Sequence, residues 1–313
     1  MRPGPRPRSR RGDQPPQANQ PREHKTTEPA DGMEQMSTAP SAARTAMLSL
    51  RGISKTFGAV NALTDVDLDV EAGEVLAIVG DNGAGKSTLV KILAGVHQAD
   101  SGTISFDGAE VQIQDPSAAI HLGIATVFQD LALCENLSVV DNLFLGRALG
   151  PWRLDQVAME VKSWELLQQL SVKIATVRVP VATLSGGQRQ TVAIARSLLG
   201  EPRVIILDEP TAALGVAQTA EVLDLIERLR GRNLGVIMIS HNMENVLAAA
   251  DRIVVLRLGR NNGEFDAGTV SSEDLVASIT GATDNVVTRR TGRLGAGAER
   301  NKDTPARTEG ESK

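Results

Sequence analysis

The stretch GDNGAGKST, residues 80–88, decides the fold of this chain. It follows an apolar run, residues 75–79, and precedes an amphipathic stretch, residues 89–96. The spacing matches the phosphate-binding P-loop pattern G-x-x-x-x-G-K-[ST], and the order of buried strand, glycine loop and helix is the context that this pattern requires. Glycine-rich turns between a strand and a helix are common, but a Lys-Ser pair at this offset favours a phosphate site.

The residue types of this loop suit phosphate chemistry. Gly80, Gly83 and Gly85 let the backbone turn tightly and aim its N–H groups at phosphate oxygens, and the helix N-terminus adds its positive dipole. We expect Lys86 to reach the β- and γ-phosphates and the Ser87 hydroxyl to ligate Mg²⁺. The nucleotide-binding residues expected in this loop are Gly80, Asp81, Asn82, Gly83, Ala84, Gly85, Lys86, Ser87 and Thr88.

Composition limits the class of protein. The chain has 313 residues and is 41% hydrophobic, with five Phe, two Trp and no Tyr, so its core must be mostly aliphatic. The net charge of −5 is unevenly spread: residues 46–285 hold 18 basic and 29 acidic side chains, and the two ends are basic. An acidic body argues against a nucleic-acid-binding surface.

Two further features bear on the compartment. The single cysteine, Cys134, excludes an intramolecular disulfide and fits a reducing compartment, with a small buried apolar side chain as its expected role. No apolar run approaches the roughly 18–20 residues that span a bilayer. The first residues are Arg-rich but lack an apolar h-region, so we expect no secretory or twin-arginine signal.

The chain divides into three parts by composition. Residues 1–45 are rich in Pro, Arg, Gln and Ser and contain few large apolar side chains, so we expect a disordered tail. Residues 46–284 should form a single domain. Residues 285–313 are polar again, and we expect a second disordered tail there.

Strands dominate the first part of the domain. Residues 48–79 alternate apolar and polar positions around a turn at Phe57 and Gly58, which predicts antiparallel strands that lead into the P-loop strand. SGTISFDG, residues 101–108, predicts a hairpin that turns at Asp107-Gly108, and residues 124–128 predict a short buried strand.

A helical segment follows, at about residues 130–200. In QVAMEVKSWELLQQL, residues 156–170, apolar side chains recur with helical spacing. The predicted apolar face comprises Val157, Val161, Trp164 and Leu167 or Gln168.

Strands and helices then alternate. The apolar runs 204–207, 236–239 and 253–256 are typical of strands that are buried on both faces of a parallel sheet. Helices are expected over 222–229 and 244–250, and a last one after Ser271 or Ser272 as N-cap. This alternation after a P-loop predicts an α/β fold with a parallel-sheet core.

A second glycine motif, LSGGQ at residues 184–188, opens a predicted helix. A serine and two glycines at a helix N-terminus form a second anion cradle. One ATP does not need two cradles from one chain. The simplest explanation is that this cradle serves ATP held by another copy or by a related subunit.

Other candidate residues stand at strand ends. VIILDEP, residues 204–210, ends a buried strand with Asp208, suited to Mg²⁺, and Glu209, suited to accept a proton from water or to orient it. Gln129 is suited to contact Mg²⁺ and the water, and His241 could hydrogen-bond the γ-phosphate. Phe57 could stack on adenine. Taken singly, each of these residues also fits a structural or solvated role.

The order of Phe57, GDNGAGKST, Gln129, LSGGQ, VIILDE and His241 resembles the nucleotide-binding subunits of ATP-binding cassette (ABC) transporters, over about residues 47–284. The resemblance implies a P-loop NTPase (RecA-like) core with an antiparallel β subdomain and a helical subdomain. It also implies a head-to-tail dimer in which Ser185, Gly186, Gly187 and Gln188 act on ATP bound by the partner, Glu209, Gln129 and His241 are catalytic, and Ser87, Gln129 and Asp208 hold Mg²⁺.

Finer motifs, among them DEPTAALGV and ISHNMENV, resemble bacterial monosaccharide importers of the ribose, xylose and fructose type, with the fructose importers favoured. The resemblance implies membrane permease subunits as direct partners, an extracellular sugar-binding protein as an indirect partner, and a peripheral position on the cytoplasmic face of the membrane. Two departures stand out. The chain has one cassette where many of these ATPases have two, and Gly215 replaces an aspartate that is usual near that position.

Two other readings remain at this point. A soluble ABC ATPase of translation or DNA repair would usually carry tandem cassettes or long coiled-coil insertions, and no heptad run occurs here. An ATP-dependent switch without turnover would not need the general base that Glu209 supplies.

Overall fold

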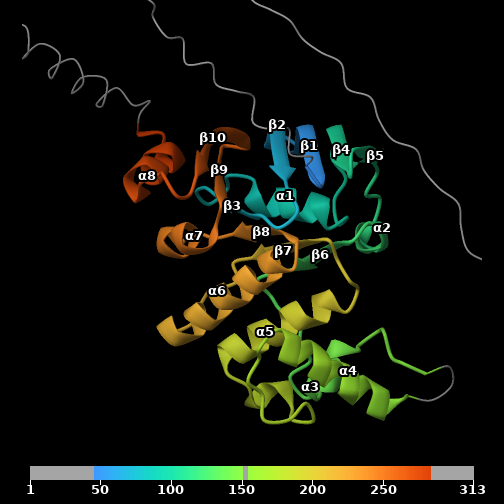
Figure 1. Cartoon of the computed structure of the whole chain (residues 1–313). Coiled ribbons are helices and arrows are strands. Elements are labelled where there is room, and N and C mark those ends of the chain that lie inside the picture. The colour runs from blue at the N-terminus through green and yellow to red at the C-terminus, as the bar shows by residue number, and fades with distance from the viewer. Residues whose placement is uncertain (1–45, 151–153, 283–313) are drawn as a thin grey trace, which may run out of the picture. The chain divides into compact units, whose positions relative to one another are not determined.

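The computed structural model describes residues 46–150 and 154–282, and the two tails predicted at 1–45 and 285–313 lie outside these ranges. The described residues build two β-sheets with helices packed around them (Figure 1). The predicted fold class, a parallel-sheet core with an added antiparallel sheet and a helical part, is therefore confirmed.

The smaller sheet is antiparallel and has four strands in the order β2-β1-β4-β5. Its strands are β1 (Leu48–Phe57), β2 (Val60–Val70), β4 (Ser101–Phe106) and β5 (Ala109–Val111). The predicted turn at Gly58 joins β1 to β2, and Asp107 and Gly108 join β4 to β5 with φ angles of 50° and 76°. Both central residues have positive φ, as a two-residue hairpin turn of type I′ requires.

The larger sheet has six strands in the order β10-β9-β3-β8-β7-β6. Its neighbours from β9 to β6 pair in parallel, and β10 pairs antiparallel with β9 at the edge. Sequence reasoning did not find β10. The strands are β3 (Val75–Val79), β6 (Ile124–Val127), β7 (Val204–Asp208), β8 (Gly235–Ile239), β9 (Arg252–Arg257) and β10 (Arg260–Asp266).

The two faces of this sheet pack against different partners. Residues such as Ile78 and Ile206 share one core with the antiparallel sheet, with α1 (Lys86–Leu93) and with α2 (Pro116–His121). Residues such as Ala77 and Leu207 share another core with the helices of the opposite face. These helices are α3 (Val139–Leu143), α4 (Gln156–Gln169), α5 (Gly186–Leu198), α6 (Val216–Gly231), α7 (Met243–Ala249) and α8 (Ser272–Thr280). Figure 1 shows α1 between the two sheets and α3, α4 and α5 on the far side of the larger sheet.

The face predicted for α4 is only partly right. Leu167 is buried as predicted and Trp164 packs against the core, but Val157 and Val161 are 73% and 52% exposed. The helix also buries Met159, Ser163 and Leu166. The buried face was hidden from the sequence pattern because it contains a serine. The hydroxyl of Ser163 donates a hydrogen bond to the carbonyl of Met159 at 2.7 Å, which satisfies this polar group inside the core.

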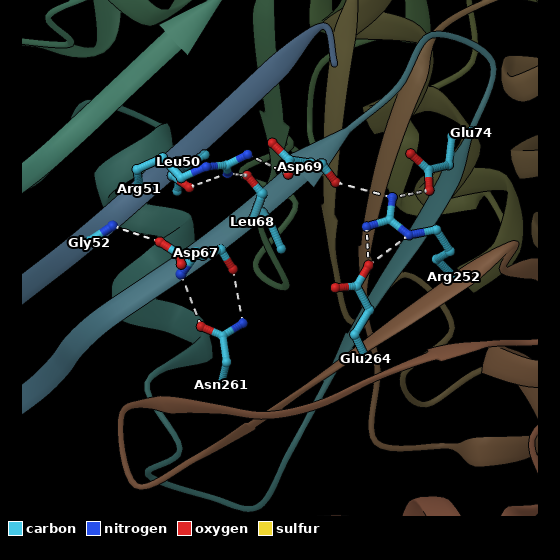
Figure 2. Close-up of polar contacts among 10 residues, drawn as sticks. All are labelled: Leu50, Arg51, Gly52, Asp67, Leu68, Asp69, Glu74, Arg252, Asn261 and Glu264. Atoms are coloured by element: carbon cyan, nitrogen blue, oxygen red, sulfur yellow. Dashed lines mark hydrogen bonds and ion pairs between the residues drawn. The ribbon is translucent and has the colours of Figure 1, made fainter. Parts of the chain in front are cut away.

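A polar network ties the antiparallel sheet to the edge of the larger sheet (Figure 2). The guanidinium of Arg252 contacts the carboxylates of Glu74, at 2.6 Å, and Glu264. Burial raises the pKa of Glu74, although a backbone N–H and Arg252 oppose this. The side-chain amide of Asn261 accepts from the backbone N–H of Asp67 and donates to its carbonyl, each at 2.9 Å. These two bonds connect β10 to β2 in the way that backbone groups connect paired strands.

Within the ranges 46–150 and 154–282, no helix combines the length and the apolar character needed to cross a bilayer.

Candidate functional site

The carboxyl ends of parallel strands meet at one edge of a sheet, and the predicted site residues follow four neighbouring strands there. The P-loop follows β3, Gln129 lies beyond β6, Asp208 and Glu209 end β7, and His241 follows β8. Residues that are far apart in the sequence thus come to a single edge, which is where open α/β sheets bind ligands.

Close packing requires glycine at two of the P-loop positions. Gly80 has φ 153°, and a Cβ there would lie 2.2 Å from the carbonyl oxygen of Leu256. Gly85 has φ 102°, and a Cβ there would lie 2.6 Å from the side chain of Leu63. Gly85 is also the N-cap of α1. Because glycine has no side chain to accept a hydrogen bond, the first backbone N–H groups of this helix have no side-chain acceptor. This arrangement fits a bound phosphate.

Lys86 lies over the loop. Its amine donates hydrogen bonds to the carbonyls of Gly80, at 2.7 Å, and Asp81, at 3.0 Å. Burial lowers the pKa of Lys86, and the nearby carboxylates of Glu209, Asp81 and Asp208 oppose this shift. The partly buried amine of Lys86 can bind an anionic ligand, and the two carboxylates beside it can bind a metal ion that accompanies this ligand.

The two carboxylates at the end of β7 affect each other. Burial raises the pKa of Asp208 and the neighbouring Glu209 raises it further, while Lys86 and Lys91 oppose the shift. A bound divalent cation would relieve the repulsion between these two adjacent carboxylates and stabilise their charged forms. The hydroxyl of Ser87 and the amide of Gln129, both on exposed residues, supply the oxygen ligands that Mg²⁺ prefers, so the residues present fit this ion.

Glu209 has an unusual backbone. Its φ of 52° lies in the left-handed region, and its N–H donates to the carbonyl of Ile239 at 3.0 Å. Its Oε1 atom lies 2.8 Å from Nδ1 of His241. A non-glycine residue in this region is strained, and such strain occurs at functional sites where the surroundings hold it.

A second contact joins the segments that follow β7 and β8, and sequence reasoning missed it. Asn245, in α7, donates a side-chain hydrogen bond to the hydroxyl of the buried Thr211 at 3.0 Å. This bond links the turn after β7 to the helix after β8. No motif contains both residues, so only the fold reveals the pair.

Phe57 lies at the end of β1 and is 44% exposed. The ring of His97 meets it edge to face at 5.2 Å, and the amine of Lys55 lies 5.5 Å from its centroid. Asp100 accepts hydrogen bonds from Lys55 and from the backbone of Thr56. The exposed ring is thus held in place and is available for stacking. His97 was not predicted as a neighbour of this position.

The LSGGQ turn caps α5. Ser185 is the N-cap, its hydroxyl accepts from the backbone N–H of Gln188, and the side chain of Gln188 accepts from the backbone of Ser185. Gln188 also donates to the carbonyl of Lys173 at 2.9 Å. A Cβ at Gly186 or Gly187 would lie 3.0 Å from Leu214 or Gln218, so this turn packs closely on the start of α6.

The LSGGQ turn is not brought to the P-loop within the chain. In the described residues, no hydrogen bond or ion pair joins residues 185–188 to residues 80–88. The helices that the two motifs begin, α5 and α1, pack on opposite faces of the larger sheet. The two cradles therefore do not surround one ligand inside a single copy.

Sequence comparisons point to one family. The family model described as ABC transporter matches residues 63–212. The fructose import ATP-binding protein of Rhizobium meliloti is 44% identical over 245 residues, which cover 75% of this chain and 94% of that protein. The xylose/arabinose import ATP-binding protein of Sulfolobus acidocaldarius is 44% identical, covering 68% and 86%. The ribose import ATP-binding protein of Clostridium perfringens is 38% identical, and the match spans 48% of its length.

Solved structures agree. A nucleotide-free ATP-binding cassette from an ABC transporter superimposes with a TM-score of 0.63 at 26% identity, covering 75% of this chain and 95% of that one. A dimeric ATP-binding cassette in a post-hydrolysis state, bound to ADP and Pi, gives a TM-score of 0.61 at 25% identity, covering 71% and 99%.

Proposed function

The chain belongs to the ABC transporter family, and we propose that it is the ATP-hydrolysing subunit of a monosaccharide importer, with fructose the favoured sugar and xylose or ribose the next candidates. Two relatives, each 44% identical and matched over 94% and 86% of their own length, are named as import proteins for fructose and for xylose/arabinose. The observation that carries the proposal is the cluster of Lys86, Asp208, Glu209 and His241 at one sheet edge.

We assign the P-loop to the phosphates of ATP and Phe57 to the adenine. Gly80, Gly83 and Gly85 let backbone N–H groups approach the phosphates, and Lys86 neutralises charge on the β- and γ-phosphates. Ser87, Gln129 and Asp208 would hold Mg²⁺. When bound, this ion neutralises the charge that develops on the phosphate oxygens.

Glu209 is assigned as the general base. Its Oε1 atom already accepts from His241, so we assign its other carboxylate oxygen, Oε2, to take a proton from the attacking water. His241, with Nδ1 held by Glu209, would contact the γ-phosphate. Gln129, just beyond β6, would orient the water. The products are ADP and phosphate.

The active assembly is proposed to be a head-to-tail homodimer. Ser185, Gly186, Gly187 and Gln188 of one copy would contact ATP on the P-loop of the other. The positions of α1 and α5 on opposite faces of the sheet support this arrangement.

A groove beside Gln129 is the proposed docking site for a permease. It has a volume of about 260 Å³, and its mostly apolar wall includes Phe128, Leu131, Leu145 and Ala193. Two relatives are named import proteins, and import requires a partner that spans the membrane. We therefore propose a peripheral position on the cytoplasmic face of the membrane, with the sugar bound by the permease and an extracellular binding protein. A role in translation or DNA repair is not favoured, because the relatives are import proteins.

Copurification tests this proposal. Membranes that contain the tagged chain are gently solubilised, its partners are identified, and Mg-ATPase activity is measured with and without fructose, xylose or ribose plus the binding protein. We expect a multi-spanning permease and a turnover that one sugar stimulates. Recovery of ribosomes or DNA-repair proteins without a permease would contradict the import function.

A further inference from the structure

Arg196 links two parts of the proposed ATPase site that are far apart in the sequence. It lies in the last turn of α5, the helix that Ser185 caps at its other end. Its Nη1 atom donates to the carbonyl of Ala132 and its Nη2 atom to the carbonyl of Leu131, both at 2.7 Å. These carbonyls follow Gln129 by only a few residues.

The turn that Arg196 holds has a specific shape. The carboxylate of Asp130 accepts from the N–H of Ala132 at 3.1 Å, and Ala132 has a φ of 46° in the left-handed region. The left-handed conformation is strained for alanine, so contacts from neighbouring residues must stabilise it. The planar guanidinium, with two donors set at a fixed spacing, is suited to hold two successive carbonyls.

The surroundings of Arg196 are unfavourable for a positive charge. Burial lowers the pKa of Arg196, and the charge of Arg147 lowers it further. A half-buried cation near another cation is retained where its hydrogen bonds compensate for lost hydration. Asp130, Leu131, Ala132 and Arg196 also line the groove beside Gln129.

We propose that Arg196 is a positioning residue that fixes the turn carrying Gln129 to the helix that carries Ser185. An occupant of the groove that moves this turn would then move α5, and with it the LSGGQ cradle presented to the partner copy. The inference rests on the proposed function for its consequence in transport. The tie between α5 and the turn can be tested without a permease.

The test is a double-mutant cycle on the full-length chain. Arg196→Met keeps the length of the side chain and removes both donors, and Gln129→Ala removes the residue through which Arg196 should act. We expect Arg196→Met to lower kcat about tenfold, with the KM for ATP changed less than about twofold, because a small misplacement of a catalytic group slows the chemistry. In the Gln129→Ala background the same change should have less than about a twofold effect.

A matched control is Arg228→Met, because Arg228 also donates to a loop carbonyl, that of Leu170 at 2.8 Å, away from Gln129. Amide hydrogen exchange at residues 130–133 measures how firmly Arg196 holds this turn, and it does so independently of ATP turnover. It should accelerate in Arg196→Met and not in Arg228→Met, and Arg196→Lys should restore part of the protection. Equal effects of Arg196→Met on kcat in both backgrounds, or unchanged exchange, would overturn the inference. A chain that lacks sugar-stimulated activity but passes these tests would refute only the transport function.

Discussion

The Nδ1 atom of His241 lies 2.8 Å from the Oε1 atom of Glu209, and this contact joins the ends of β8 and β7. A carboxylate only accepts hydrogen bonds, so Nδ1 must carry the proton. The contact therefore orients the imidazole and holds the general base that we assign in one position. For Nε2 to donate to the γ-phosphate as well, the ring must carry both protons. The strained backbone of Glu209, with φ 52°, makes such support necessary.

Glu209→Gln removes the base but keeps the size of the side chain. We expect turnover to fall by about 10²- to 10⁴-fold, the range for loss of general base catalysis, while ATP still binds. An ATP-bound dimer should accumulate, which size-exclusion chromatography with labelled ATP would detect. Glu221→Gln, at an exposed position of α6, is the control. Normal turnover in Glu209→Gln would show that the assigned mechanism is wrong.

Asn245→Ala and Thr211→Val each break the 3.0 Å bond that joins the turn after β7 to the helix α7 after β8. Each change should lower thermodynamic stability by about 1 kcal/mol, the typical net value of one hydrogen bond, and should also lower kcat. Because both residues act through one bond, the double variant should be little worse than either single one. Denaturant unfolding and ATPase assays check this. Fully additive losses would contradict a shared role.

The parallel core was predictable because its strands are short, fully apolar and followed by motif residues. Val75–Val79 and Gly235–Ile239 are buried along their whole length, so their composition signals their position directly. The edge strand Arg260–Asp266 was missed because it is mostly exposed and polar. Backbone pairing with β9 stabilises this strand, and composition does not reveal such pairing.

The site residues could be proposed because most of them stand at strand ends and the LSGGQ residues open a helix. Contacts between motifs could not be assigned. The bond between Asn245 and Thr211 and the two bonds of Arg196 depend on which loops the sheet order brings together. Ser163 shows the same limit in α4, because its buried hydroxyl is satisfied by a backbone carbonyl that no pattern reveals.

Arg252→Met should destabilise the junction between the two sheets, because it leaves the buried carboxylate of Glu74 without its cation. We expect a loss of about 1–3 kcal/mol in the free energy of unfolding, as for a buried group without a partner. Denaturant unfolding at several pH values would measure this loss.

The pH dependence has a definite sign. The pKa of Glu74 is raised in the folded state, so its contribution to stability is fully present below the ordinary pKa of glutamate and is lost as the pH rises through the raised value. Removal of Arg252 raises this pKa further. The deficit of Arg252→Met should therefore shrink as the pH falls and Glu74 becomes protonated. A deficit that does not change with pH would contradict this account, and Glu74→Gln in the same background should reduce it at neutral pH.

A fragment of residues 46–284 should fold and hydrolyse ATP. Both hydrophobic cores are built from residues between Met47 and Leu275, so the fragment keeps the packing that stabilises the domain. Circular dichroism and ATPase assays of the fragment and of the full chain are the comparison. Loss of cooperative unfolding in the fragment would show that this boundary is wrong.

The most direct test of the account is whether two copies complete one ATP site. Lys86→Ala removes the phosphate contact of the P-loop, and Ser185→Arg blocks the LSGGQ cradle, so neither variant alone should form an ATP-bound dimer. Mixed in equal amounts, they can assemble one intact site from the P-loop of one chain and the cradle of the other. Measured by ATP-dependent association of two differently labelled chains, the mixture should form dimers that neither variant forms alone. Complete absence of such mixed dimers would contradict the composite site.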